Sequence, residues 1–130
     1  MSGHMFFADE YFGYDDAIYA ACRFIRILSE SNKSVSQLLD DVPKTFSTPE
    51  IRVDCPDDEK FEVVKKVAAE LKKDFKTVDI DGVRIIYEHG WGLVRASNTQ
   101  PVLVLRFEAD SEKNLNYIKN TIESKLREYV

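Results

Sequence analysis

Two apolar runs rich in valine and leucine flank one short polar loop, and this arrangement constrains the fold more than any other feature of the chain. The runs cover residues 91–94 and 102–107, and residues 95–101 form the loop between them. Runs of this kind are typical of buried β-strands. The sequence therefore predicts a strand–turn–strand unit within a larger sheet.

The loop gathers several groups that can bind an anion. Its polar residues are Arg95, Ser97, Asn98 and Thr99, and Pro101 ends it. A guanidinium fork, hydroxyls, an amide and backbone N–H groups can together hold one phosphate. Ser, Asn and Pro are also common turn formers, so the spacing alone fits an ordinary hairpin turn equally well.

Residues 44–130 carry a pattern of several strands and two helices. We predict strands over residues 50–54, 77–80, 83–87, 91–94 and 102–108, with Asp81-Gly82 as a two-residue hairpin signal. Apolar residues at helical spacing define the buried helix faces: Phe61, Val64, Val67, Ala68 and Leu71, then Leu115, Ile118, Ile122 and Leu126. This order predicts an α+β fold, with a mainly antiparallel four- to five-stranded sheet covered by two helices.

Residues 1–43 are predicted to form a helical segment that precedes this domain. A helix over residues 14–30 has Asp15 and Asp16 in its first turn, where carboxylates complement the helix dipole. Its apolar stripe consists of Ile18, Ala21, Cys22, Ile25 and Leu28. We expect this stripe to pack against a part of the protein outside these 130 residues.

Charge and composition exclude several classes of protein. The net charge of -5 argues against an extended nucleic-acid surface, so we predict no nucleic-acid partner. No apolar run reaches the length of a membrane span. Cys22 and Cys55 form neither a CxxC pair nor a disulfide framework, which predicts a reducing, cytoplasmic setting. His4 and His89 have no Cys or His at metal-ligand spacing, so we predict no metal site.

Two segments of the chain resemble one family. The run Gly90-Trp91-Gly92-Leu93-Val94-Arg95-Ala96-Ser97-Asn98-Thr99-Gln100-Pro101 and the strand after it resemble the phosphate-binding segment of the α-D-phosphohexomutases, in the bacterial phosphomannomutase/phosphoglucomutase branch. The start, Met1-Ser2-Gly3-His4-Met5, resembles the sugar-binding loop of the same family, Gly-Glu-Met-Ser-Gly-His. Taken alone, this start looks like a cloning scar. The two motifs occur in the family's order, which favours the family.

The resemblance implies how the chain is organised. Residues 1–43 correspond to the tail of the sugar-binding third domain, and residues 44–130 to the phosphate-binding fourth domain, which has a TATA-binding-protein-like fold. In this family the catalytic phosphoserine lies in the first domain and the Mg²⁺-binding aspartates in the second. Neither has a counterpart here, so we expect the fragment to be inactive alone and its partners to be the N-terminal domains of the same chain. Mg²⁺ would then bind the full-length protein and not this fragment.

The resemblance also assigns roles to residues. The family interconverts hexose 1-phosphate and hexose 6-phosphate, of mannose or glucose, through a phosphoserine enzyme and a hexose 1,6-bisphosphate. Arg95, Ser97, Asn98 and Thr99 match the group that holds the phosphate that is not reacting. Ser2 matches a contact to a sugar hydroxyl, and His4 matches a catalytic group for proton transfer or phosphate contact.

The sequence also fits two other functions. The chain could be a stand-alone binding module for a phosphorylated small ligand, in which case Arg95 and its neighbours bind the ligand but no reaction follows. It could also be a purely structural interaction domain whose hairpin turn binds nothing.

Overall fold

The computed structural model describes residues 3–130, and the chain divides into two units. The first is Met1–Pro43 and the second is Lys44–Val130. Ser2, a predicted sugar contact, lies outside the described residues. None of the helices in residues 3–130 combines the length and apolar character needed to cross a membrane.

The first unit contains the helix α1, Ala17–Glu30, and the short 3-10 helix η1, Ser36–Leu39. The prediction that Asp15 and Asp16 lie in the first turn of α1 is wrong. Asp16 is instead the N-cap, and its side chain accepts hydrogen bonds from the backbone N–H groups of Ile18 and Tyr19, both at 2.9 Å. α1 contains no buried residue, and its apolar residue Ile18 is 79% exposed.

The second unit is built on a six-stranded antiparallel sheet. Its strands are β1 (Phe46–Ser47), β2 (Ile51–Asp54), β3 (Lys76–Val78), β4 (Val83–Tyr87), β5 (Gly90–Ala96) and β6 (Val102–Ala109). Their order is β1-β6-β5-β4-β3, and β2 also pairs with β6. The α+β fold is therefore as predicted, but the count of four to five strands is wrong. The additional strand is β1, in which Phe46 and Ser47, outside the predicted strands, pair with the end of β6.

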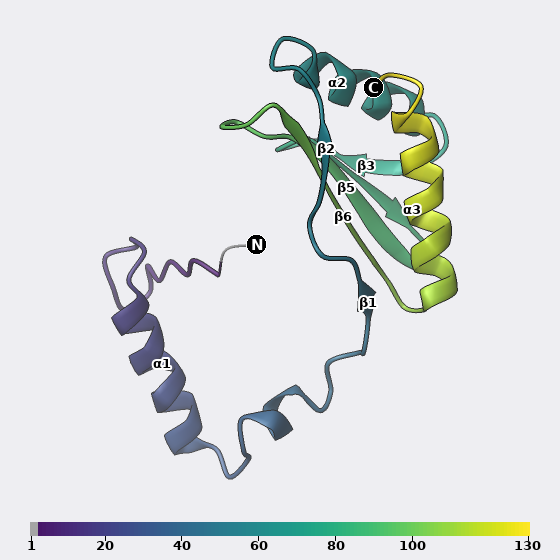
Figure 1. The fold of residues 1–130 in the computed structure, drawn as a ribbon. Coiled ribbons are helices and arrows are strands. Elements are labelled where there is room, and N and C mark those ends of the chain that lie inside the picture. Colours follow the sequence, from purple (N-terminus) through teal and green to yellow (C-terminus); the bar gives the residue numbers. More distant parts are fainter. Residues whose placement is uncertain (1–2) are drawn as a thin grey trace. The chain divides into compact units, whose positions relative to one another are not determined.

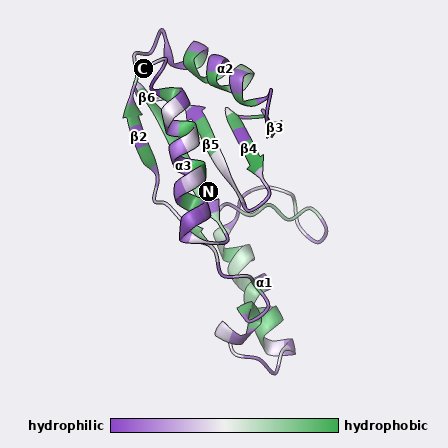
Figure 2. Ribbon diagram, turned by 90° about the vertical axis from the view of Figure 1, so that its right-hand side faces the viewer, coloured by the Kyte–Doolittle hydropathy of each residue, from purple (hydrophilic) through white to green (hydrophobic). Residues whose placement is uncertain are grey.

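Two helices, α2 (Lys60–Leu71) and α3 (Glu112–Leu126), pack on the sheet through its central strands (Figure 1). Ser111 caps α3 by accepting a hydrogen bond from the backbone N–H of Asn114. Both helices carry hydrophobic and hydrophilic residues (Figure 2), and their buried residues recur at helical spacing, as in amphipathic helices. Fully or almost fully buried residues of the strands and helices form one core: Val67, Val83, Ile85, Val94, Leu103, Leu105, Phe107, Ile118 and Ile122.

The buried face of α2 differs from the prediction at its start. Phe61, which we expected in the core, is 50% exposed, whereas Val63 and Lys60 are each only 4% exposed. The helix begins at Lys60, and Lys60 and Val63 take the buried positions of its first turn in place of Phe61. Val64, Val67 and Leu71 are buried as expected.

The turn between β3 and β4 is longer than the predicted two-residue hairpin. β3 ends at Val78, so residues 79–82 form the turn and Ile80 is 93% exposed. Gly82 has a φ of +79°, a left-handed conformation that favours glycine. A side chain there would also lie 2.5 Å from the Cβ of Arg95, so only glycine lets this turn rest against β5.

Candidate functional site

The polar loop joins β5 to β6, and backbone hydrogen bonds fix its base. The N–H of Ser97 donates to the carbonyl of Val102 at 3.0 Å, and the N–H of Val102 donates to the carbonyl of Gln100 at 2.8 Å. The carbonyl of Pro101 accepts a hydrogen bond from the N–H of Cys55 at 2.9 Å, which ties the loop to the end of β2. The loop backbone is therefore held from both flanking strands.

Ser97 holds the loop from inside. It is 7% exposed, and its Oγ accepts hydrogen bonds from the backbone N–H groups of Thr99 at 3.3 Å and Gln100 at 3.1 Å. A serine hydroxyl in this arrangement replaces a backbone carbonyl and closes a tight turn. The predicted phosphate-binding hydroxyl of Ser97 thus faces the turn in this structure and orders it.

Lys60, the first residue of α2, hydrogen-bonds to the loop backbone. Its Nζ donates to the carbonyl oxygen of Gln100 at 3.0 Å and pairs with the carboxylate of Asp57 at 2.5 Å. Lys60 and Ser97 are the two buried polar residues in the described part of the chain, and both bond to this one loop. Lys60 is absent from the predicted site residues, although a lysine at the first residue of a helix opposes the helix dipole and could have indicated a special contact.

Arg95 lies on the face of the sheet opposite the two helices. Successive residues of a strand point to opposite faces, and Gly92, three positions before Arg95 in β5, faces Ile122 of α3. A carboxylate oxygen of Asp81 accepts a hydrogen bond from Nη1 of Arg95 at 2.7 Å. Because a guanidinium has five N–H donors, several remain for a ligand.

Asn98 and Thr99 form the exposed tip of the loop, and neither side chain makes a hydrogen bond among the described residues. Next to them, Gln100 accepts a hydrogen bond through Oε1 from Nη1 of Arg52 at 2.8 Å. Arg52 also pairs with Glu50 at 2.9 Å. The loop therefore has free amide and hydroxyl groups at its tip and a second guanidinium at its side.

Each cation at the loop is paired with a carboxylate. Arg95 pairs with Asp81, Arg52 with Glu50 and Lys60 with Asp57. The site is thus close to electrically neutral in this state, although it is rich in donors. Such an arrangement can bind and orient an anion, and its loop contains no pair of a nucleophile and a base that could make or break a covalent bond.

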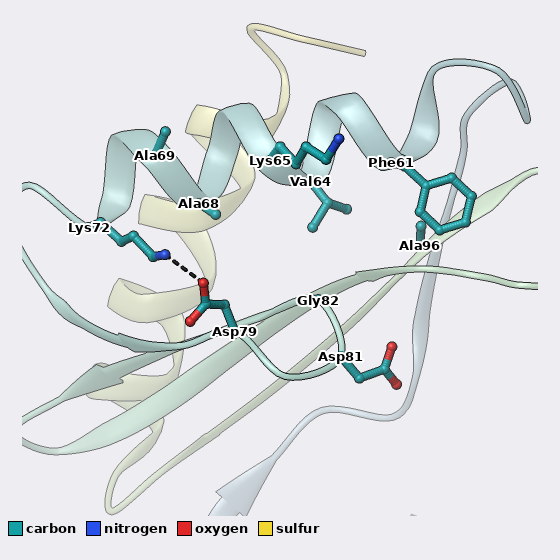
Figure 3. A pocket seen from close by; sticks show the side chains of 10 residues that line it. All are labelled: Phe61, Val64, Lys65, Ala68, Ala69, Lys72, Asp79, Asp81, Gly82 and Ala96. Atoms are coloured by element: carbon teal, nitrogen blue, oxygen red, sulfur yellow. Dashed lines mark hydrogen bonds and ion pairs between the residues drawn. The ribbon is translucent and has the colours of Figure 1, made fainter.

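A groove of about 390 Å³ runs between α2 and the turn formed by residues 79–82 (Figure 3). Its walls include Phe61, Ala68, Lys72, Asp81 and Ala96. Lys72 and Asp79 join the two walls at one end through an ion pair of 2.6 Å, and this contact lowers the pKa of the Asp79 carboxyl below its usual range. The turn that carries Asp81 is thereby attached to α2.

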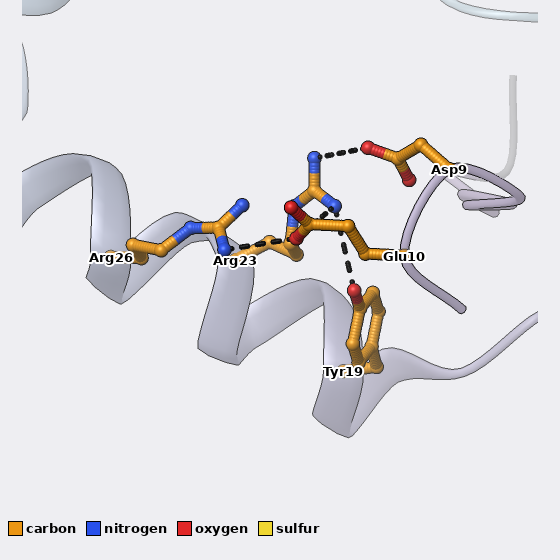
Figure 4. Close-up of polar contacts among 5 residues, drawn as sticks. All are labelled: Asp9, Glu10, Tyr19, Arg23 and Arg26. Carbon is orange, nitrogen blue, oxygen red and sulfur yellow. Dashed lines mark hydrogen bonds and ion pairs between the residues drawn. The ribbon is translucent and has the colours of Figure 1, made fainter.

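The residues predicted to contact the sugar belong to the first unit. Nδ1 of His4 hydrogen-bonds to the carboxylate of Asp15. Nearby, Arg23 of α1 donates to Asp9 at 2.9 Å and to Glu10 at 3.3 Å, and Arg26 donates to Glu10 at 2.9 Å (Figure 4). The hydrogen bond from Arg23 lowers the pKa of Asp9.

This network ties the segment after His4 to the middle of α1. His4 belongs to the first unit, and the four loop residues Arg95, Ser97, Asn98 and Thr99 belong to the second.

Comparisons with known proteins match both units. Residues 50–125 match the family model described as the phosphoglucomutase/phosphomannomutase C-terminal domain. Residues 1–46 match the model described as the phosphoglucomutase/phosphomannomutase alpha/beta/alpha domain III.

Similar proteins include a phosphomannomutase/phosphoglucomutase of Pseudomonas putida, 46% identical over 97% of this chain and 27% of the relative. A phosphoglucomutase of Neisseria gonorrhoeae is 42% identical over 95% of this chain and 27% of its own length. The crystal structure of a phosphoglucomutase/phosphomannomutase family protein from Burkholderia thailandensis superposes with a TM-score of 0.85 at 39% identity. The superposition covers 99% of this chain and 27% of the Burkholderia chain, and it confirms the predicted α+β fold. The chain thus spans 27% of the length of the first curated relative.

Proposed function

Because the chain belongs to the phosphoglucomutase/phosphomannomutase family, an isomerase family, we propose that residues 95–99 hold the phosphate of a hexose phosphate. The phosphate in question is the one that is not reacting. The full-length protein would interconvert hexose 1-phosphate and hexose 6-phosphate, of mannose or glucose, through a phosphoserine enzyme and a hexose 1,6-bisphosphate. Holding one end of the sugar fixes the position of the other end for transfer.

One observation carries this proposal: a rigid loop presents free donors. Buried Ser97 and Lys60 fix the backbone, whereas Asn98 and Thr99 are exposed and their side chains are unengaged among residues 3–130. Arg95 adds a guanidinium with donors to spare, and a planar guanidinium matches a phosphate in two-point contact. Fixing the loop in advance lowers the entropy cost of binding.

The reacting groups of the proposed enzyme would come from other parts of the protein. The matched relatives are longer than this chain, which covers 27% of the first of them, so the remaining domains are its expected partners. No group of three or more His, Cys, Asp or Glu residues among those described could hold a metal ion. Mg²⁺ stays an expected ligand of the other domains of the full-length protein.

His4 is the candidate for proton transfer or phosphate contact. Asp15 accepts from Nδ1 of His4, and an acceptor at this nitrogen favours the tautomer with its proton on Nδ1. Nε2 is then left as the atom that can accept a proton. Ser2 stays a predicted contact to a sugar hydroxyl.

The proposal can be tested on the 130-residue chain by titrating glucose 1-phosphate and mannose 1-phosphate while following the backbone amide signals of residues 97–99. We expect local shifts that Arg95→Ala abolishes. Arg84→Ala is the matched control, since Arg84 also lies on a strand of this sheet but stacks on Trp91, 4.2 Å from the ring centre. No shift at millimolar ligand, or equal loss in both variants, would contradict the proposal and favour a structural turn.

A further inference from the structure

Asp81 is the hydrogen-bond partner of the Arg95 guanidinium. Its Oδ2 lies 2.7 Å from Nη1 of Arg95, and the two residues are separated by 14 positions in the chain. The contact is open to solvent, with the Arg95 side chain 37% exposed and the Asp81 side chain 64% exposed. An arriving phosphate can therefore reach the same guanidinium.

The close approach of the turn to β5 holds Asp81 at this place. Gly82 permits this approach, because any side chain there would collide with the backbone of Val94 and with Arg95. The ion pair of Asp79 with Lys72 lies in the same turn but is exposed to solvent, so it adds little to this placement. Asp81 consequently stays beside Arg95 without help from a ligand.

We propose that Asp81 is a positioning residue that competes with the phosphate for Arg95. This inference rests on the proposed function of the loop. The carboxylate and the phosphate both accept from the same guanidinium, so binding of the phosphate has to weaken or replace the contact with Asp81. The two anions also repel each other, and at a given distance this repulsion is twice as strong for a phosphate dianion as for a monoanion.

The consequence is a site that binds the phosphate less tightly and releases it faster. A competing carboxylate lowers the affinity for phosphate, and a weaker site releases its ligand faster, because differences in affinity between related complexes lie mostly in the off-rate. A sugar that must present each of its phosphates to the loop in turn has to leave the site between the two steps. Asp81 would speed that release without any change in the donors Asn98 and Thr99.

The test compares Asp81→Asn with Asp79→Asn in the 130-residue chain, with glucose 1-phosphate as the probe. Asparagine keeps the shape and an oxygen acceptor at position 81 but removes the charge. We expect Asp81→Asn to lower the Kd about twofold to fivefold, as suits loss of an exposed charge contact next to the site. Asp79→Asn removes a charge from the same turn but not from Arg95, and we expect less than about a twofold change on the same scale.

A double-mutant cycle ties the effect to Arg95. In the Arg95→Ala background, Asp81→Asn should have no effect on the Kd, because the group for which it competes is gone. In the ligand-free protein, the NMR signal of the Arg95 Nε–H should also shift in Asp81→Asn and stay unchanged in Asp79→Asn.

Each outcome bears on one claim. A Kd that rises or stays constant in Asp81→Asn, while Arg95→Ala abolishes binding, overturns the competition and leaves the proposed phosphate site standing. Binding that survives Arg95→Ala overturns the proposed function itself. Equal tightening in Asp81→Asn and Asp79→Asn overturns the competition as well, since it would show a general effect of charge.

Discussion

Replacing Ser97 with alanine should destabilise the second unit without removing any exposed ligand contact. The variant loses two hydrogen bonds, of 3.3 Å to the N–H of Thr99 and 3.1 Å to the N–H of Gln100. An average protein hydrogen bond contributes about 0.5–1.5 kcal/mol, and both of these are longer than the commonest distance. Water can also reach the exposed residues 99 and 100 and replace part of the loss. We therefore expect the free energy of unfolding to fall by about 1 kcal/mol.

Urea unfolding followed by tryptophan fluorescence measures this loss. The chain has one tryptophan, and it is Trp91 in β5, so its fluorescence reports on the second unit alone. A loss of this size corresponds to a midpoint shift of about 0.5–1 M urea. The backbone amides of residues 99 and 100 should also exchange their hydrogens faster in the variant.

Thr99→Ala is the matched control, because Thr99 is exposed in the same loop and its hydroxyl makes no hydrogen bond among the described residues. We expect its stability to change by less than about 0.5 kcal/mol. If Ser97→Ala were as stable as Thr99→Ala, with unchanged exchange at residues 99 and 100, the hydroxyl of Ser97 would not order the turn. Weaker binding of glucose 1-phosphate with unchanged stability would assign Ser97 to the ligand instead.

Two further predictions concern the core and the far end of the sheet. Gly92→Ala should lower the free energy of unfolding by about 1–3 kcal/mol, because the new Cβ would overlap Cδ1 of fully buried Ile122 and lie 3.0 Å from Phe107. Circular dichroism during urea unfolding measures this loss, and an unchanged unfolding midpoint would contradict the packing. Burial raises the pKa of Tyr87 from 10.0 to about 12. The unfolded chain therefore releases this proton first, so wild-type stability should fall between about pH 10 and pH 12, and Tyr87→Phe should reduce that fall. The Tyr87 hydroxyl is also buried without a hydrogen-bond partner among the described residues, so the same variant should be at least as stable as wild type at pH 7, and identical pH profiles would refute the assignment.

Much of the fold of the second unit follows from local pattern. The strands around residues 83–87, 91–94 and 102–108 and the buried positions Ile118, Ile122 and Leu126 lie where the apolar periodicity predicts them. The family resemblance was confirmed by the match to both domains. The errors lie at the ends of helices and strands, where a single cap or turn sets the boundary. Asp16 shortens α1, and the four residues 79–82 replace a two-residue hairpin.

Within the candidate site, local pattern identified the donors but not their surroundings. Arg95, Asn98 and Thr99 were predicted from their types and their place between two apolar strands, and their binding role stays a prediction. Lys60 was missed because its contact with Gln100 spans 40 positions of the chain. No periodicity within a helix or strand contains information about a partner so far away.

The sequence by itself determined which elements form and which side chains the loop can offer, because apolar periodicity and residue chemistry are local properties. The tertiary structure alone decided how those side chains are used. It turned the hydroxyl of Ser97 inward to its own loop, placed buried Lys60 beneath the carbonyl of Gln100, and brought Asp81 to Arg95. Those choices depend on how the strands pair and how closely Gly82 lets a turn approach its neighbour, and such distances exist only after the sheet has formed.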